Sequence, residues 1–217
     1  MKIGTDGVLL GAWADVDGNS HILDVGTGSG LIAIMAAQRN AQADIVAIDI
    51  VEDAAAQARA NVERCAWSRR IEVLCGDVNE LNVERKFDHI VSNPPFFTET
   101  LQSPDEARRT ARHATTLTYQ DIVAVAERLL MPGGKLSVVL PYDAAMAFRG
   151  VAFEHLWLRR QMDVVTVEGG VPKRTLMEFQ LCDRPLMPRC DTLVIQHRDG
   201  SYTEQYRTLT QDFYLNF

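Results

Sequence analysis

The four residues Asn93-Pro94-Pro95-Phe96 follow the apolar run Phe87–Ser92 and give the clearest chemical signal in the chain. The Asn93 side chain and the Pro94 carbonyl offer two oxygen acceptors, while each proline fixes φ and removes a backbone donor. Two such acceptors can hold the hydrogens of a planar amine, such as the exocyclic amine of a nucleobase, and favour a nucleophilic, tetrahedral nitrogen. Phe96 would stack on the ring. We predict that these four residues are catalytic, although Pro-Pro after a strand is by itself more often a rigid turn.

A glycine-rich segment, Gly26-Thr27-Gly28-Ser29-Gly30, lies between a predicted buried strand, His21–Val25, and a helical pattern over residues 31–39. Glycines let a backbone approach a ligand closely, and the next helix begins with unpaired N–H groups, which ordinarily suits a pyrophosphate. A dinucleotide fingerprint needs its third glycine one position later, where this chain has Leu31. NAD and FAD are therefore the weaker fit. Instead, Asp24–Gly30 resembles the first motif of S-adenosylmethionine-dependent methyltransferases.

Two further predicted strands end in acidic residues. Residues 45–48 lead to Asp49, about twenty residues beyond the glycine loop, where a carboxylate can accept hydrogen bonds from ribose hydroxyls. Residues 71–75 lead to Gly76-Asp77, and in the resembled family that aspartate meets the adenine amine of the cofactor. Alone, Asp24 can cap a turn, Asp49 can be a solvated acid and Asp77 can cap a helix. Together with Asn93, they would project at the carboxyl edge of one sheet, where ligands bind.

Length and composition limit which folds and which cellular locations are plausible for this chain. The 217 residues, 47% of them hydrophobic, suffice for one α/β domain spanning 1–217. No apolar stretch approaches the roughly twenty residues that span a bilayer, and the first residues lack the apolar core of a signal peptide, so we expect a cytoplasmic protein. The four cysteines have no metal-ligand spacing, which predicts buried, reduced thiols and neither zinc nor a disulfide. They are Cys65, Cys75, Cys182 and Cys190.

A net charge of −7 argues against indiscriminate coating of nucleic acid, so RNA binding would depend on local basic patches. The cluster at residues 108–113 follows the predicted catalytic residues Asn93–Phe96 in the sequence, and we expect residues 99–116 to form a substrate loop. Lys173-Arg174 is a second candidate. Solvated faces are the preferred interpretation of Arg69-Arg70 and Arg159-Arg160. A structural role is preferred for the histidines outside the first cluster, which are His21, His89, His155 and His197.

The alternation of strand and helix patterns predicts a mostly parallel α/β sheet with helices on both faces. Residues 54–67 and 119–131 have helical patterns, and Pro132-Gly133-Gly134 precedes a fifth strand over residues 135–140. One more helix should follow, then strands near residues 164–167, 176–181 and 192–195, the last of uncertain placement. We predict a seven-stranded, Rossmann-like sheet.

Nearly the whole chain resembles the bacterial valine-tRNA adenine-N6 methyltransferases. The stretches that carry the resemblance are the first-motif loop, Gly4–Ala14, Asn93–Phe97, Ala111–His113, Tyr202–Glu204 and Asp212–Leu215. The resemblance implies S-adenosylmethionine as the cofactor and an adenine beside the anticodon of valine tRNA as the substrate. Members of the family carry a further N-terminal segment, which this chain would lack. We expect a monomer that uses neither a metal nor a membrane.

The resemblance also assigns roles by position. Thr5, Asp6 and Gly7 would lie near the cofactor, although a helix cap is an equal alternative for the first two. The other cofactor residues would be Asp24, Gly26, Gly28, Gly30, Asp49 and Asp77, and the RNA contacts would be Arg112, His113, Lys173 and Arg174.

Alternatives of three classes remain open at this stage: another amine methyltransferase, an oxidoreductase and a binding module. Asn-Pro-Pro followed by an aromatic residue also serves guanine-N2 methyltransferases acting on ribosomal RNA, and glutamine-amide methyltransferases acting on release factors. A nucleotide-dependent oxidoreductase is disfavoured by the glycine spacing. A catalytically silent RNA-binding module is disfavoured because the predicted catalytic sequence Asn93-Pro94-Pro95-Phe96 is complete.

Overall fold

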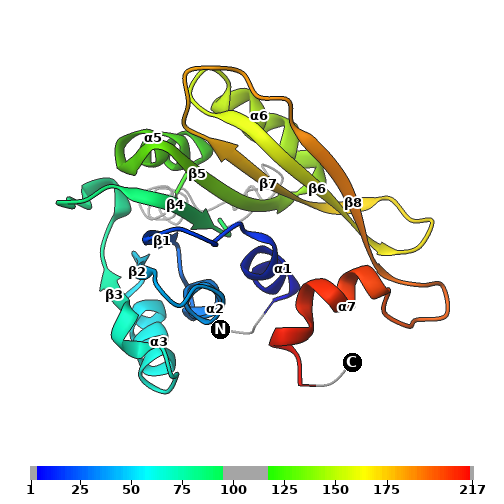
Figure 1. Cartoon of the computed structure of the whole chain (residues 1–217), viewed down its shortest axis with the longest axis horizontal. Helices are drawn as coiled ribbons and strands as arrows, with labels where there is room; N and C mark the ends of the chain where they lie inside the picture. Colours follow the sequence, from blue (N-terminus) through cyan, green and yellow to red (C-terminus); the bar gives the residue numbers. More distant parts are fainter. Residues whose placement is uncertain (1–3, 95–116, 216–217) are drawn as a thin grey trace, which may run out of the picture.

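The computed structural model describes residues 4–94 and 117–215, which form an eight-stranded sheet in the order β3-β2-β1-β4-β5-β7-β6-β8 (Figure 1). The first five strands in this order run parallel to one another, whereas β7 is antiparallel to both β5 and β6. The strands are β1 His21–Val25, β2 Asp44–Asp49, β3 Ile71–Cys75, β4 Phe87–Ser92, β5 Leu130–Pro141, β6 Trp157–Val167, β7 Pro172–Gln180 and β8 Arg189–Gln196.

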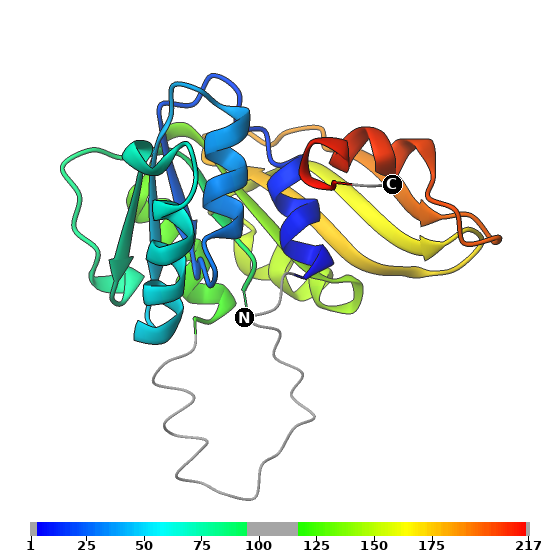
Figure 2. The same ribbon diagram turned by 90° about the horizontal axis from the view of Figure 1, so that it is seen from below.

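Helices cover both faces of this sheet (Figure 2). One apolar core joins α1, α2, α3 and α7 to one face, and a second core joins α5 and α6 to the other. The α-helices are α1 Thr5–Trp13, α2 Leu31–Arg39, α3 Glu52–Glu63, α5 Tyr119–Leu129, α6 Ala145–Ala152 and α7 Glu204–Thr210, and the 3-10 helices are η1 Ser68–Arg70, η2 Val78–Glu80, η3 Tyr142–Ala144 and η4 Gln211–Phe213. The predicted α/β class with a mostly parallel sheet is confirmed.

The predicted strand number was wrong, because the sheet has eight strands rather than seven. The additional strand is β8, which lies at the sheet edge and pairs parallel with β6. An edge strand has a partner on one side only, and most residues of β8 are half-buried or exposed. Its apolar alternation is therefore short, which explains why the sequence pattern placed it poorly.

Two predicted helices end earlier than their patterns indicated. The helix expected over residues 54–67 is α3, which begins at Glu52 and ends at Glu63. The helix expected to reach Met131 ends at Leu129, because the buried Leu130 already pairs with Phe87 of β4. Gly133 lies inside β5 with φ 83°, a left-handed conformation that glycine accepts without strain. No helix of the described residues is long and apolar enough to cross a membrane.

Candidate active site

The carboxyl ends of β1, β2 and β4 meet as the sequence predicted. Val25, the last residue of β1, is in register with Ile48 of β2 on one side and with Ser92 of β4 on the other. The Ser92 hydroxyl donates a 2.9 Å hydrogen bond to the Val25 carbonyl. Gly26 and Asn93 are therefore the first residues beyond the ends of two neighbouring strands, so the glycine loop begins beside the Asn93-Pro94 step.

The glycines of the loop have two different structural roles. Gly26, Gly28 and Gly30 all have positive φ, at 69°, 58° and 81°, which favours glycine at each position. A Cβ at Gly26 would meet no atom of the described residues within 4 Å, whereas one at Gly30 would lie 3.4 Å from the Ala58 backbone in α3. Gly30 thus permits close packing of the loop on α3. Gly26 borders open space that a ligand can fill.

Asp24 is fully buried beneath this loop, and the described residues form hydrogen bonds with only one of its two carboxylate oxygens. Its Oδ2 accepts hydrogen bonds from the Thr27 hydroxyl at 2.6 Å and from the Ala33 N–H at 3.1 Å. Its Oδ1 is buried and has no partner among the described residues. Burial raises the pKa of this carboxyl to about 6. A buried carboxylate oxygen without a donor is costly, and a cationic or N–H-bearing ligand would complete its bonding.

Asp49 and Asp77 lie at the ends of neighbouring strands and both hold local backbone. Asp49 Oδ2 accepts from the Gly28 N–H at 2.8 Å, and its Oδ1 accepts from the Val51 N–H at 2.9 Å. The Gly76 N–H donates to the Asp49 carbonyl, which brings Asp77 beside Asp49. Asp77 caps η2 through Asn79, so the helix-capping alternative holds for this residue. Because each carboxylate oxygen has two acceptor positions, these caps leave room for a ligand's hydroxyl or amine.

The Asn93-Pro94 step is set against the end of β4, with Asn93 half-buried and Pro94 buried. The other two predicted catalytic residues, Pro95 and Phe96, lie outside the described residues. So do Arg112, His113 and the predicted substrate loop.

Thr5, Asp6 and Gly7 form the first turn of α1. The N-cap of this helix is Gly4 and no side chain caps it, so the capping alternative for Thr5 and Asp6 was wrong. Asp6 Oδ2 instead accepts a 2.8 Å charge-assisted hydrogen bond from Arg174 Nε. Both residues line a cavity of about 200 Å³ between α1 and strands β6, β7 and β8, which Lys173 also lines. The ion pair therefore joins Asp6, which the sequence suggested for the cofactor, to Arg174, which it suggested for the RNA.

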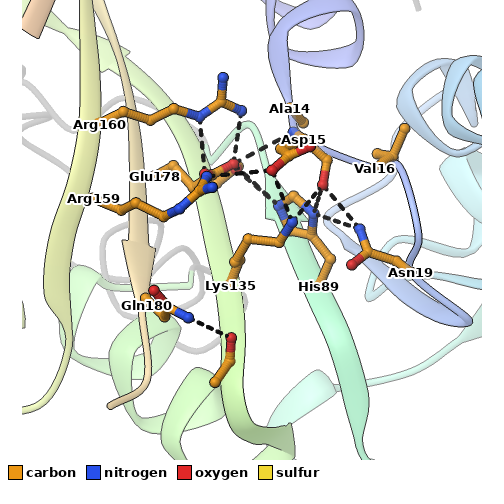
Figure 3. A network of polar contacts seen from close by, with 12 residues as sticks. Ala14, Asp15, Val16, Asn19, His89, Lys135, Arg159, Arg160, Glu178 and Gln180 are labelled. Carbon is orange, nitrogen blue, oxygen red and sulfur yellow. Dashed lines mark hydrogen bonds and ion pairs between the residues drawn. The ribbon is translucent and has the colours of Figure 1, made fainter. Parts of the chain in front are cut away.

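A buried ionic network at the opposite, amino-terminal end of the sheet was missed by the sequence analysis (Figure 3). Glu178 is fully buried and binds both Arg159 and Arg160, so the interpretation of these arginines as a solvated face was wrong. Ser137 donates to Glu178 at 3.1 Å and lies 2.9 Å from His89 Nε2. The signal was present: His89, Ser137 and Glu178 are polar residues inside apolar strands that pair with one another.

The pKa values of His89 and Glu178 in this network both fall, but for different physical reasons. Burial lowers the pKa of His89 to about 4, because the neutral imidazole is favoured away from water. The pKa of Glu178 falls to about 2, because hydrogen bonds and charge from Arg160 outweigh its desolvation. The structural interpretation of His89 is confirmed.

Two smaller predictions also need correction. Arg70 is no solvated residue, because its guanidinium donates to the carbonyls of Ala37, Asn40 and Ala43. All four cysteines carry free thiols, but none is buried: Cys75 and Cys190 are exposed and the other two are half-buried. Among residues 4–94 and 117–215, no group of three His, Cys, Asp or Glu side chains could hold a metal ion.

Comparison with known proteins places this site in a family. Residues 6–148 match the family model described as Methyltransferase small domain. The curated tRNA1(Val) (adenine(37)-N6)-methyltransferase of Bacteroides fragilis is 44% identical over 99% of this chain and 91% of its own length. The protein of the same name from Serratia proteamaculans is 42% identical over 99% of this chain and 84% of its own length.

Among solved structures, a predicted O-methyltransferase from Agrobacterium tumefaciens superposes with a TM-score of 0.74 at 22% identity, over 95% of this chain and 96% of that one, which supports the fold. The identity to the curated relatives over nearly full length shows the family as well as the fold. The chain belongs to the family of tRNA1(Val) (adenine(37)-N6)-methyltransferases.

Proposed function

We propose that this protein transfers the methyl group of S-adenosylmethionine to the N6 amine of adenine 37 in tRNA1(Val), the reaction that its relatives' names describe. The observation that carries the proposal is the adjacency of the glycine loop and the Asn93-Pro94 step. The Ser92–Val25 hydrogen bond fixes this adjacency at the carboxyl edge of the sheet. Ligands of open α/β sheets bind at this edge.

The residues around the glycine loop fit the cofactor. We propose that Asp24, Gly26, Gly28 and Gly30 hold its methionine portion, because Asp24 Oδ1 lacks a donor and Gly26 borders open space. Asp49 and Asp77 would take the ribose hydroxyls and the adenine amine, and the first turn of α1, which carries Thr5, Asp6 and Gly7, would border the cofactor. When bound, S-adenosylmethionine supplies a methyl group already activated by its sulfonium, so the protein needs no nucleophile of its own.

Asn93 and Pro94 would bind the substrate amine. The Asn93 side-chain oxygen and the Pro94 carbonyl accept its two hydrogens, which localises the nitrogen lone pair for attack. Pro95 would fix the backbone, and stacking on Phe96 would contribute about 1–3 kcal/mol. Extruding a base costs a few kcal/mol, and less in a loop than in a duplex, which favours an anticodon loop over double-stranded DNA.

The RNA contacts, assembly and location follow from the same proposal. We propose that Arg112, His113 and the exposed Lys173 contact the tRNA backbone. We further propose that the whole chain works as one domain and as a monomer, which light scattering can test. We also propose that it acts in the cytoplasm, because its proposed substrate is a tRNA.

Replacing Asn93 by Ala tests the role of the step. We expect turnover on unmodified tRNA1(Val) to collapse while the dissociation constant for S-adenosylmethionine, measured by calorimetry, changes little. Asn82→Ala is a matched control, because Asn82 is exposed and precedes β4 at the far end of the strand. Near-normal turnover by Asn93→Ala would remove the amine-acceptor role.

A further inference from the structure

Helix α1 packs directly against the start of α2, the helix that follows the glycine loop. Two glycines in α1 make the close approach possible. A Cβ at Gly7 would lie 3.2 Å from the Leu31 side chain, and one at Gly11 would lie 2.6 Å from the sulfur of Met35. Leu31 is the first residue of α2 and follows Gly30. The position of the first turn of α1 is therefore coupled to the end of the glycine loop.

The carboxyl end of α1 is fixed independently of its amino end. Arg160 stacks on the Trp13 ring at 4.0 Å and donates to the Trp13 carbonyl at 3.0 Å. Arg39 of α2 donates to the carbonyls of Gly11 and Ala14. Asp15, just beyond the helix, joins the buried network through Lys135 (Figure 3). This end of the helix is held whatever happens near Asp6.

The amino end of α1 is held to the sheet by Arg174. Arg174 lies on β7 opposite Pro141, the last residue of β5, and thus at the carboxyl edge of the sheet. Its Nε donates to Asp6 Oδ2 at 2.8 Å, and its Nη1 donates to the Lys173 carbonyl. The Arg174 side chain is 34% exposed and that of Asp6 is 20% exposed. The guanidinium is thus bound to the protein on two sides.

We propose that Arg174 is a positioning residue for methyl transfer rather than an RNA contact. Through Asp6 it holds the first turn of α1 against Leu31, so that the glycine loop keeps the shape that binds the cofactor. Its neighbour Lys173 is exposed and is the member of the Lys173-Arg174 pair that faces the RNA. This assignment rests on the proposed function and deepens it, because it separates two adjacent cations into a structural and a substrate role.

A double-mutant cycle with Asp6→Asn and Arg174→Gln tests the proposal. Since a partly exposed ion pair adds little to global stability, both variants should fold. We expect each substitution to raise the dissociation constant for S-adenosylmethionine, measured without RNA, by about threefold to tenfold. The double variant should be no weaker than the weaker single variant, because both substitutions remove one shared interaction. Arg174→Lys, which keeps a charge for Asp6, should restore part of the affinity.

Lys173→Gln is the matched control from the adjacent position. It should leave cofactor affinity unchanged, raise the KM for tRNA, and reduce the salt dependence of RNA binding by about one unit of slope. The proposal is overturned if Arg174→Gln behaves like Lys173→Gln, or if the effects of Asp6→Asn and Arg174→Gln on cofactor binding are additive. These outcomes are distinct from failure of the proposed function, which would show as a wild-type protein that does not methylate tRNA1(Val).

Discussion

At the scale of single residues, the candidate site contains groups that the protein leaves incomplete. Within residues 4–94 and 117–215, Asp24 is buried with one oxygen that has no hydrogen-bond partner, and Gly26 faces open space in a left-handed conformation. The sequence singled out both positions, because the Asp-x-Gly-x-Gly-x-Gly spacing is typical of a backbone that approaches a ligand, and their role in cofactor binding stays a prediction. It could not predict that Asp49 and Asp77 also hold backbone N–H groups, since those bonds depend on how neighbouring strand ends meet in space.

The buried Asp24 carboxyl gives a pH-dependent prediction. Its pKa is raised from 3.8 to about 6 on folding, so the unfolded chain loses this proton first. The carboxyl costs folding nothing below about pH 4, the penalty builds up between about pH 4 and 6, and it is constant above that range. Asp24→Asn removes this penalty and should therefore be more stable than wild type at pH 7 by about 2–3 kcal/mol. Urea denaturation at pH 4, 5, 6 and 7 measures the difference, which should shrink toward pH 4. A difference independent of pH would contradict the buried, ionised carboxylate.

The open space at Gly26 predicts a loss of binding with little loss of stability. Gly26→Ala places a methyl group where no atom lies within 4 Å in the part of the chain that the structure describes, so it should block the cofactor and raise its dissociation constant at least tenfold. The positive φ costs about 1 kcal/mol of stability. Gly18→Ala is the matched control, because Gly18 has nearly the same φ, 71°, and equally open surroundings in a turn outside the site. Equal cofactor affinity in the two variants would show that the space at Gly26 does not receive the ligand.

At the scale of elements, the site depends on contacts that link α1 to strands far away in the sequence. The sequence predicted strand β4 and its Asn93 step well, because an apolar run followed by Pro-Pro is a local signal. It assigned no helix to α1, since Gly7 and Gly11 are poor helix formers and their value lies in packing against α2. Arg159 and Arg160 were also misjudged, because their partner Glu178 is on another strand.

The buried ionic network makes a prediction about stability. Glu178→Gln should lower the free energy of unfolding by about 3–5 kcal/mol, because it leaves Arg159 and Arg160 without their shared buried carboxylate. Glu168→Gln provides a contrast, since Glu168 contacts His197 through a hydrogen bond between two side chains that are about half exposed, and should cost less than about 1 kcal/mol. Chemical denaturation at pH 7 measures both. Similar small losses would mean that the network does not anchor the loop after α1.

At the scale of the whole molecule, the sheet order determines which residues can work together. Strands β1, β2, β3 and β4 bring Gly26, Asp49, Asp77 and Asn93 to one edge, as the βαβ pattern of the sequence predicted. The antiparallel β7 brings Arg174 to that same edge from a distant part of the chain. Parallel pairing through helices is readable from local periodicity, whereas the placement of β6, β7 and β8 depends on long-range pairing, and the sequence undercounted strands there.

Overall charge bears on the substrate interaction. With a net charge of −7, the protein as a whole repels RNA, so binding must rely on local cations and should weaken with salt, by a slope set by the number of phosphates they contact. We expect the KM for tRNA to rise with added potassium chloride while cofactor affinity in the absence of RNA stays nearly constant. Steady-state kinetics at several salt concentrations, paired with calorimetry, would test this. A KM for tRNA that is insensitive to salt would contradict recognition through phosphate contacts.

The most direct test of the account is methyl transfer to an unmodified tRNA1(Val) transcript, with the product nucleosides identified by mass spectrometry. We predict one N6-methyladenosine per tRNA, absent when adenine 37 is replaced by another base and absent with the Asn93→Ala variant. Methylation that appears as N2-methylguanosine, or that persists after adenine 37 is replaced, would contradict the account.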